Sequence, residues 1–487
     1  MIFNNIGQIS TAELIKIYMD EFMASPERKL MEDGEKYYLV ENTRINEREM
    51  YRYEDRGGTP IKVTDEAKPN HKLAHGYMYV LIEDKINYLL AKPYSISHIK
   101  EGSKCIDSIN EVLGKKFQAK RMTRLGVEAS NKGIAWLHPY ISPDGEFKTR
   151  VIPSEQCIPL WADSEHEELQ AMIWFYDVEV VEGNEQSTVT KVEYWTSDGV
   201  AFYVNAGENL VLDAERYLNS TGSEENEFVE HFQVGKFREA GTWGAVPFVP
   251  FKNNDFEKPD LQFVKTIVDE YDIARSDIAN TLDEVKSVIF GLKGYGGQDL
   301  SEFMRDLSYF RAISLDEDGG FEAYNPNLNI ESAKSHYEAL KKDIFDFGQG
   351  VDKNSDKLGN SPSGVALKFI YSGLDLKCNR MENAFAEGFG ILLYFVNKYL
   401  ELTGMGAEDM SEVSIVFNRD ISINESQSIT DCQNSKGLIS DKTIIENHPW
   451  TTDVDEEIKQ VESENSLADD EKFFKDKNSS GEDGGTN

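Results

Sequence analysis

The sequence predicts an α+β fold in which two long helices flank a compact insert. Apolar residues recur at alternating spacings of three and four from Leu261 to Ile289 and again from Ile330 to Phe347, which is typical of helices that pack along one narrow face. Glycines interrupt the segment between these two patterns. From Gly133 onward the apolar period changes to two, which indicates strands in the first half of the chain.

The first patterned helix is expected over Leu261–Ile289, and unbroken it would span roughly 40 Å. Acidic residues outnumber basic ones on its other faces, which suits a helix that packs along one seam and meets water elsewhere. The packing seam predicted for it consists of Val268, Tyr271, Ile278, Leu282 and Val285.

The second patterned helix ends at the stop signals Gly348 and Gly350. Between the two helices, the insert from Gly291 to Asn325 combines three early glycines with a short helical pattern and a strand-like Ala312–Leu315. It is interpreted as a small α/β module held on two helical stalks.

Ser10 and Glu13 form a possible capping box for a first helix, and a second helix is expected from Asn42 to Glu54. A third is expected within residues 68–93, where His71 and His75 are four residues apart. That spacing could present two metal ligands. Position 72, however, is lysine where a zinc-protease motif needs glutamate, so ordinary packing is favoured.

A helix is expected from Lys104 to Ser130, followed by strands. Residues 134–140 and 147–152 alternate around a Ser-Pro-Asp-Gly turn and predict a hairpin. Residues 244–254 contain two prolines and an Asn pair, which argues against regular structure there. Further strands are expected at Ala171–Val178, Val189–Thr196 and Val200–Val204.

Residues 351–363 (VDKNSDKLGNSPS) have the composition of a loop, with Lys353 and Lys357 as its positive charges. Composition alone favours a solvated connector over a loop that projects toward an anion. A long helix follows from Gly364 to about Leu402. The expected later elements are a strand at Val413–Phe417 and helices within Glu425–Asn447 and Asp453–Glu464.

The composition limits the classes of function. A formal charge of −36 argues against affinity gained by neutralising phosphates, which requires clustered Lys and Arg. The four cysteines are scattered without metal-binding spacing, and the apolar stretch Phe389–Val396 is too short to span a bilayer. Nucleotide-binding, nucleophile-elbow and zinc-protease motifs are missing, so we expect no catalysis, no cofactor and no bound metal.

Several segments, in a fixed order along nearly the whole chain, carry a family resemblance. The chain resembles the portal proteins of tailed double-stranded DNA bacteriophages, in the branch of long-tailed phages that infect Gram-positive bacteria. The matching pieces are Asn70, Lys72, His75, Lys85, Tyr88, Lys92 and Pro93; Pro247, Pro250, Asn253 and Asn254; and residues 271–285, 292–297, 316–320, 361–369 and 437–458.

The resemblance implies a portal fold with named parts. The wing would comprise residues 1–258 together with the long helix and closing strand at 364–421. The other parts would be stem helices at 259–290 and 326–349, a clip at 291–325, a tunnel loop at 350–363 and a crown at 422–470. The acidic composition of the last residues separately predicts a disordered tail at 471–487.

The resemblance also implies a function. Portal proteins form a ring, usually a dodecamer, at one capsid vertex, through which double-stranded DNA is packaged and later ejected. The implied partners are the terminase large subunit, the head–tail adaptor, and the major capsid and scaffolding proteins. The implied location is the virion, after assembly in the host bacterial cytoplasm. A channel lined with acids would let the duplex slide without sticking.

The resemblance assigns sites to two segments. The tunnel loop would face DNA through Lys353, Asn354, Lys357 and Asn360. The clip would dock the motor near Gly294, Tyr295, Gly296 and Gly297. On the stem helices, the apolar seams fit subunits packed side by side around an axis.

Two alternatives remain at this point. One is a different ring protein of the phage head–tail connector, although a chain of 487 residues with two stalks exceeds what an adaptor needs. The other is an acidic intracellular hydrolase that uses carboxylates of the wing.

Overall fold

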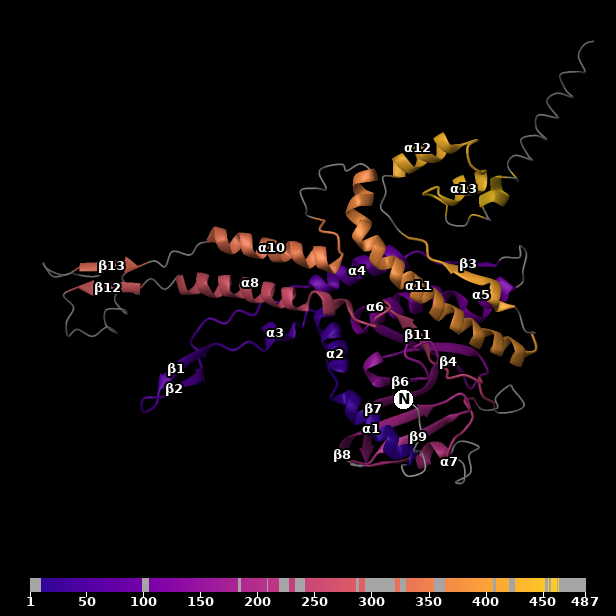
Figure 1. The fold of residues 1–487 in the computed structure, drawn as a ribbon, viewed down its shortest axis with the longest axis horizontal. Coiled ribbons are helices and arrows are strands. Elements are labelled where there is room, and N and C mark those ends of the chain that lie inside the picture. Colours follow the sequence, from indigo (N-terminus) through magenta and orange to yellow (C-terminus); the bar gives the residue numbers. More distant parts are fainter. Residues whose placement is uncertain are drawn as a thin grey trace, which may run out of the picture. The chain divides into compact units, whose positions relative to one another are not determined.

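A computed structural model describes most of the chain. The described residues are 10–98, 105–182, 185–207, 209–218, 227–232, 241–285, 289–293, 320–324, 330–353, 364–405, 409–419 and 425–451, with 454, 457–461 and 463. They form a mixed helix and sheet fold, which confirms the predicted class (Figure 1). The chain divides into two compact units. One contains Met1–Asp352 and Gly373–Arg419, and the other Lys353–Ser372 and Asp420–Asn487.

The first helix, α1 (Thr11–Met23), begins at the predicted capping box. The Ser10 hydroxyl accepts from the Glu13 amide, and the Glu13 carboxylate accepts from the Ser10 amide at 2.9 Å. The next helix, α2 (Pro26–Tyr38), was not predicted, although Ser25 caps it and Pro26 occupies its first turn.

The helix expected over Asn42–Glu54 is wrong beyond the short α3 (Thr43–Asn46). Strands β1 (Tyr51–Asp55) and β2 (Pro60–Thr64) instead form an antiparallel hairpin. Gly57 and Gly58 both have positive φ, so they allow the tight turn that a helix would not need.

The helix expected within 68–93 is shorter than predicted, because α4 spans Tyr77–Leu90. His71 and His75 precede it in a non-helical segment, so they do not share a helix face. Among the residues that the structure describes, no group of three or more His, Cys, Asp or Glu side chains could hold a metal ion.

The helix expected over 104–130 is interrupted. Gly114, with φ of 68°, kinks α5 (Cys105–Lys116), and the π-helical turn η1 (Phe117–Arg121) connects it to α6 (Met122–Lys132). Gly133 ends α6 with φ of 88°, and a Cβ there would lie 2.1 Å from the carbonyl oxygen of Glu257. Only glycine fits this approach.

The predicted hairpin is confirmed as β4 (Ile134–Ile141) and β5 (Phe147–Ile152). The irregular segment expected at 244–254 is wrong in part, because β11 (Val249–Lys252) pairs with β4. The order β11-β4-β5 makes β11 an edge strand, which is where a strand tolerates a proline such as Pro250.

A second, five-stranded antiparallel sheet has the order β10-β9-β8-β7-β6. It contains the three further strands that the sequence predicts. The strands are β6 (Cys157–Trp161), β7 (Leu169–Glu182), β8 (Glu185–Trp195), β9 (Val200–Asn205) and β10 (Leu210–Leu212), with η2 (Ser154–Gln156) before and α7 (Ala214–Leu218) after them.

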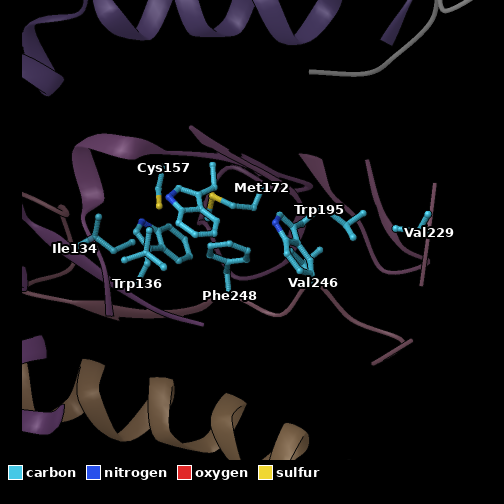
Figure 2. Packing of buried hydrophobic residues seen from close by; sticks show 11 residues of the cluster. Ile134, Trp136, Cys157, Met172, Trp195, Val229, Val246 and Phe248 are labelled. Carbon is cyan, nitrogen blue, oxygen red and sulfur yellow. The ribbon is translucent and has the colours of Figure 1, made fainter. Parts of the chain in front are cut away.

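Strand β7 contributes to hydrophobic clusters on both faces of this sheet, because successive side chains of a strand point to opposite sides. Met172 and Trp174 join a cluster with Trp136, Trp195 and Phe248 (Figure 2). The alternate residues of β7 pack with Ile15 and Met19 of α1 on the other face.

The two patterned helices are confirmed with changed ends. A 3-10 turn, η3 (Asp260–Phe263), precedes α8 (Lys265–Val285), and the second helix is α10 (Ile330–Gly348). Ile289 does not belong to the first helix, because β12 (Ile289–Lys293) pairs with β13 (Gly320–Tyr324). The expected motor-docking residues 294–297 lie outside the described residues.

The long helix is confirmed as α11 (Gly364–Thr403). After η5 (Met410–Glu412), strand β14 (Val413–Val416) pairs with β3 (Ser95–His98). In the second unit, α12 (Glu425–Ser435) and α13 (Asp441–Glu446) match one expected helical region. Asn354, Lys357 and Asn360 of the expected tunnel loop, and the expected tail 471–487, lie outside the described residues.

Candidate functional site

The candidate site is the pair of helices α8 and α10, which lie side by side (Figure 1). Their contact is aromatic and cationic. The ring of Tyr271 meets Tyr337 edge to face at 6.4 Å, and the Arg275 guanidinium lies 4.6 Å from the centre of the Tyr337 ring. Arg275, which interrupts the apolar stripe in the sequence, therefore has a packing role between the two helices.

The predicted seam divides into two parts. Val268 and Tyr271 are buried within a single chain, and Tyr271 also packs against Tyr77 of α4 at 5.0 Å. Ile278 is half-buried and Leu282 is 46% exposed. The side chain of Val285 lies outside the described residues. Among the seam side chains that the structure describes, only Ile278 and Leu282 are thus accessible to a second copy.

A second stripe of α8, adjacent to the seam, is polar and buried. Asp272, Ser276 and Asn280 accept hydrogen bonds from the backbone amides of His75, Leu73 and His71 at 3.1, 3.0 and 2.7 Å. We call this arrangement the polar ladder.

The polar ladder forms because one helical repeat of α8 has nearly the same length as two residues of the extended segment beside it. Two residues of an extended chain span about 6.6 Å. Four residues of an α-helix span about 6 Å. Side chains at every fourth helix position can therefore meet every second amide of a segment running alongside. The spacing of Asp272, Ser276 and Asn280 was the signal in the sequence, and sequence reasoning missed it.

Side chains reinforce the polar ladder. Asp272 also contacts the His75 ring nitrogen at 2.7 Å and accepts from the Asn42 amide, and His71 contacts Asp283. Both histidines that had been weighed as metal ligands are thus paired with aspartates of α8. Arg48 forms an ion pair with Asp277 on the same helix.

A buried ionic cluster lies where α8 begins. The Lys85 ammonium donates to Asp260 at 2.7 Å and to Asn253 at 2.8 Å, and Lys377 lies 3.0 Å from the same Asp260 oxygen. Asn253 also donates to the second Asp260 oxygen at 2.9 Å. We call these four residues the hub.

The hub perturbs the ionisation of its members. Burial lowers the pKa of Lys85 to about 8, and the nearby Asp260 only partly offsets this effect. Burial alone would raise the pKa of Asp260, but the ammonium groups of Lys377 and Lys85 outweigh it and hold that pKa well below its usual range. The carboxylate is therefore charged at neutral pH.

The hub joins elements that are far apart in sequence. Lys85 belongs to α4, Asp260 to η3 and Lys377 to α11, and Lys377 also donates to the carbonyl of Gly348 at the end of α10. The hub thereby fixes the root of both patterned helices. Sequence reasoning did not assemble this cluster, although Lys85 and Asn253 are among the residues that carry the resemblance.

The chain leaving α10 is also held in place. A Cβ on Gly350 would lie 2.2 Å from a Leu81 side-chain carbon, so glycine permits close passage along α4. Val351 is buried, and Asp352 forms an ion pair with Lys341 at 2.9 Å. The segment that was expected to face DNA thus starts from a fixed point.

Comparison with known proteins decides the family. Residues 25–471 match the family described as "Phage portal protein, SPP1 Gp6-like". The chain belongs to the phage portal protein family. This confirms the resemblance inferred from the sequence.

Two relatives support this assignment. The portal protein of Clostridium phage phiCD119 is 30% identical over 422 residues, covering 83% of this chain and 86% of that protein. The portal protein of Bacillus phage SPP1 is 26% identical over 476 residues, covering 94% and 91%. Both are named portal proteins, as this family assignment requires.

Among solved structures, a chain from the "Neck of native GTA particle computed with C12 symmetry" aligns with a TM-score of 0.40. Its identity is 11%, and the alignment covers 76% of this chain and 88% of that one. A likeness this distant carries no argument about assembly. Within the described part of this portal chain, every helix is too short or too polar to cross a membrane.

Proposed function

We propose that this portal protein assembles into a ring of about twelve copies, as the resemblance implies, and that α8 and α10 form the stem around a DNA channel. The observation that carries the proposal is the way this pair is held. The hub fixes the end where α8 begins, and the polar ladder holds α8 along its length from Asp272 to Asn280. The strand pair β12–β13 begins beyond the other end, and the segment after Gly348 leads into residues 350–363.

The proposed parts are those that the resemblance implies. Residues 1–258 and 364–421 form the wing, 259–290 and 326–349 the stem, and 291–325 the clip. Residues 350–363 form the tunnel loop, and 422–470 the crown. The remaining seam residues, Ile278 and Leu282, contact neighbouring copies.

The charge of the chain suits a passage for DNA. The net charge of −36 repels the duplex, so DNA slides without strong binding. In the tunnel loop, Lys353 and Lys357 are repeated by the ring and form sparse positive collars. Such collars grip phosphates weakly and without regard to base sequence. Asn354 and Asn360 supply neutral polar groups beside them.

The proposed partners act at the two ends of the stem. The clip, with Gly294, Tyr295, Gly296 and Gly297, docks the terminase large subunit during packaging and the head–tail adaptor afterwards. The wing and crown contact the major capsid and scaffolding proteins. The role is structural, without catalysis by this chain, and the protein resides at one vertex of the virion after assembly in the host cytoplasm.

Replacement of the clip tests this function. A chain in which residues 294–319 are replaced by the matching segment of an unrelated portal should still form rings, because the stem is held at its other end. Phages that carry it should accumulate empty heads, measured as DNA per particle. Full heads from that chain would contradict motor docking by the clip.

A further inference from the structure

The hairpin β1–β2, residues 51–64, projects as an arm, and it has exposed apolar or aromatic side chains on both faces. Tyr51, Tyr53 and Ile61 are exposed, and Tyr53 is 73% exposed. The strand pairing places Tyr51 and Tyr53 on one face and Ile61 on the other. A lone two-stranded hairpin is marginally stable in water, so a bare one is expected to gain stability from a surface that covers it.

Ion pairs and a hydrogen bond hold the arm at its root. Arg48, just before β1, forms an ion pair with Asp277 of α8. Just after β2, the buried Asp65 contacts Arg52 at 3.5 Å, and the Lys68 ammonium donates to the Tyr51 carbonyl at 3.1 Å. The polar ladder then ties residues 71–75 to α8. The position of the arm is therefore coupled to α8, the helix proposed to meet neighbouring copies.

A second exposed apolar surface lies at the end of α2 and on α4. It consists of Leu39 and Val40 after α2 and Tyr79 and Val80 on α4, and we call it the apolar patch. These residues are contiguous, because Val40 and Tyr79 side-chain atoms both lie within 4 Å of where a Gly76 Cβ would be. Leu39 is 57% exposed and Tyr79 49% exposed. The arm of the same chain therefore does not cover this patch.

The charges around the two surfaces are complementary. The arm carries Arg52, Arg56 and Lys62 against Glu54 and Asp55, and both arginines pair with Glu54, so the net charge of the arm is only slightly positive. The apolar patch is bordered by carboxylates, with Lys36 partly offsetting them. The carboxylates are the exposed Glu41, the exposed Glu35, which also pairs with Lys132 at 3.0 Å, and the half-buried Glu83, which accepts from the Tyr38 hydroxyl. An aromatic surface with a small positive net charge opposite an apolar surface bordered by carboxylates gives orientation as well as attraction.

We infer that the arm of one copy docks on the apolar patch of the next copy in the ring. A contact between two different surfaces of the same chain is heterologous, and repetition of such a contact about an axis closes a ring. This inference rests on the proposed ring. It adds a partner surface outside the seam of α8.

Thiol cross-linking tests the contact. We would combine Tyr53→Cys with Leu39→Cys, and compare this protein with a control that combines Tyr53→Cys with Ile17→Cys on α1. Ile17 is 52% exposed. Both carry Cys432→Ser, since Cys432 is half-buried whereas Cys105, Cys157 and Cys378 are buried. Purified rings are treated with a short bis-maleimide and separated on a denaturing gel.

The expected result is a ladder of covalent multimers reaching the full ring for the Tyr53–Leu39 pair, and dimers at most for the control. An absent ladder, or equal ladders for both pairs, in protein that forms rings would overturn the arm contact and leave the ring proposal standing. A parent protein that remains monomeric would overturn both.

Discussion

Changing Asp260→Asn tests how the root of the stem is held. The substitution keeps the shape of the side chain but removes the one carboxylate that faces two ammonium groups, those of Lys85 and Lys377 at 2.7 and 3.0 Å. Breaking a buried ion pair by removing one partner costs about 3–5 kcal/mol. We expect a loss of this size for Asp260→Asn, because Lys85 is fully buried.

Two further variants show whether the loss in the free energy of unfolding is specific to the buried carboxylate of the hub. Lys85→Met leaves Asp260 with Lys377 and with the Asn253 amide, so we expect it to cost less than Asp260→Asn. Asp20→Asn removes the partner of Lys16 in a surface pair whose aspartate is 63% exposed. We expect Asp20→Asn to cost less than about 1 kcal/mol.

The pH dependence gives a second readout. The folded pKa of Lys85 is depressed to about 8 from 10.5, so between these values the unfolded chain binds more protons and stability rises with pH. Without Asp260 the pKa of Lys85 should fall further, and the rise should begin at lower pH. The deficit of Asp260→Asn should therefore shrink as the pH increases toward about 8.

Urea unfolding followed by tryptophan fluorescence measures these differences, because Trp136, Trp174, Trp195 and Trp243 are buried in the unit that contains the hub. A loss below about 1 kcal/mol at neutral pH for Asp260→Asn would refute the account of the hub as a buried, mutually dependent ionic cluster.

Three other predictions concern the stem and its loop. Ile278→Asp should abolish ring assembly but leave a folded monomer by circular dichroism. Val268→Asp should instead unfold the chain, because Val268 is buried within it. Rings formed by Ile278→Asp would show that this face of α8 does not contact a neighbouring copy. Ser276→Ala should leave the Leu73 amide unpaired, cost about 1–2 kcal/mol and speed its hydrogen exchange; unchanged exchange would contradict the polar ladder. Changing Lys353 and Lys357 to Ala should preserve rings but lower the DNA retained per filled head, and parental DNA content would make the loop a plain connector.

The sequence was sufficient to predict those helices and strands whose apolar pattern is local. The bounds of helix α11 were predicted almost to the residue, because apolar side chains recur at helical spacing along its 40 residues. Its buried positions include Leu374, Met381, Phe385, Phe389, Leu392 and Val396. The hairpin β4–β5 was found because alternation and a Pro-Asp-Gly turn coincide.

Errors arose where local signals conflict. The first residues of the arm, up to Glu54, were assigned to a helix because Arg, Glu and Met favour helices, although Tyr51 and Tyr53 alternate as in a strand. Pro250 masked β11, because its strand lies at a sheet edge where no amide is needed. Helix α8 was extended through Ile289 because an apolar stripe does not reveal that a strand partner lies near Tyr324.

The candidate site could be predicted only in part. The two stalks and their apolar faces follow from spacing, but the hub joins Lys85, Asp260 and Lys377 across more of the chain than any local pattern covers. The division of the seam also depends on tertiary packing, because Tyr77 of α4 covers Tyr271 and leaves Ile278 to other partners.

Electron microscopy of the purified parent protein tests the central claim most directly. Averaged top views should show closed rings with a central hole and cyclic symmetry, and side views should show a narrow stem that carries the α8–α10 pair close to the axis. Uniform monomers at concentrations that suffice for phage assembly, or compact oligomers without a hole, would contradict the proposed channel.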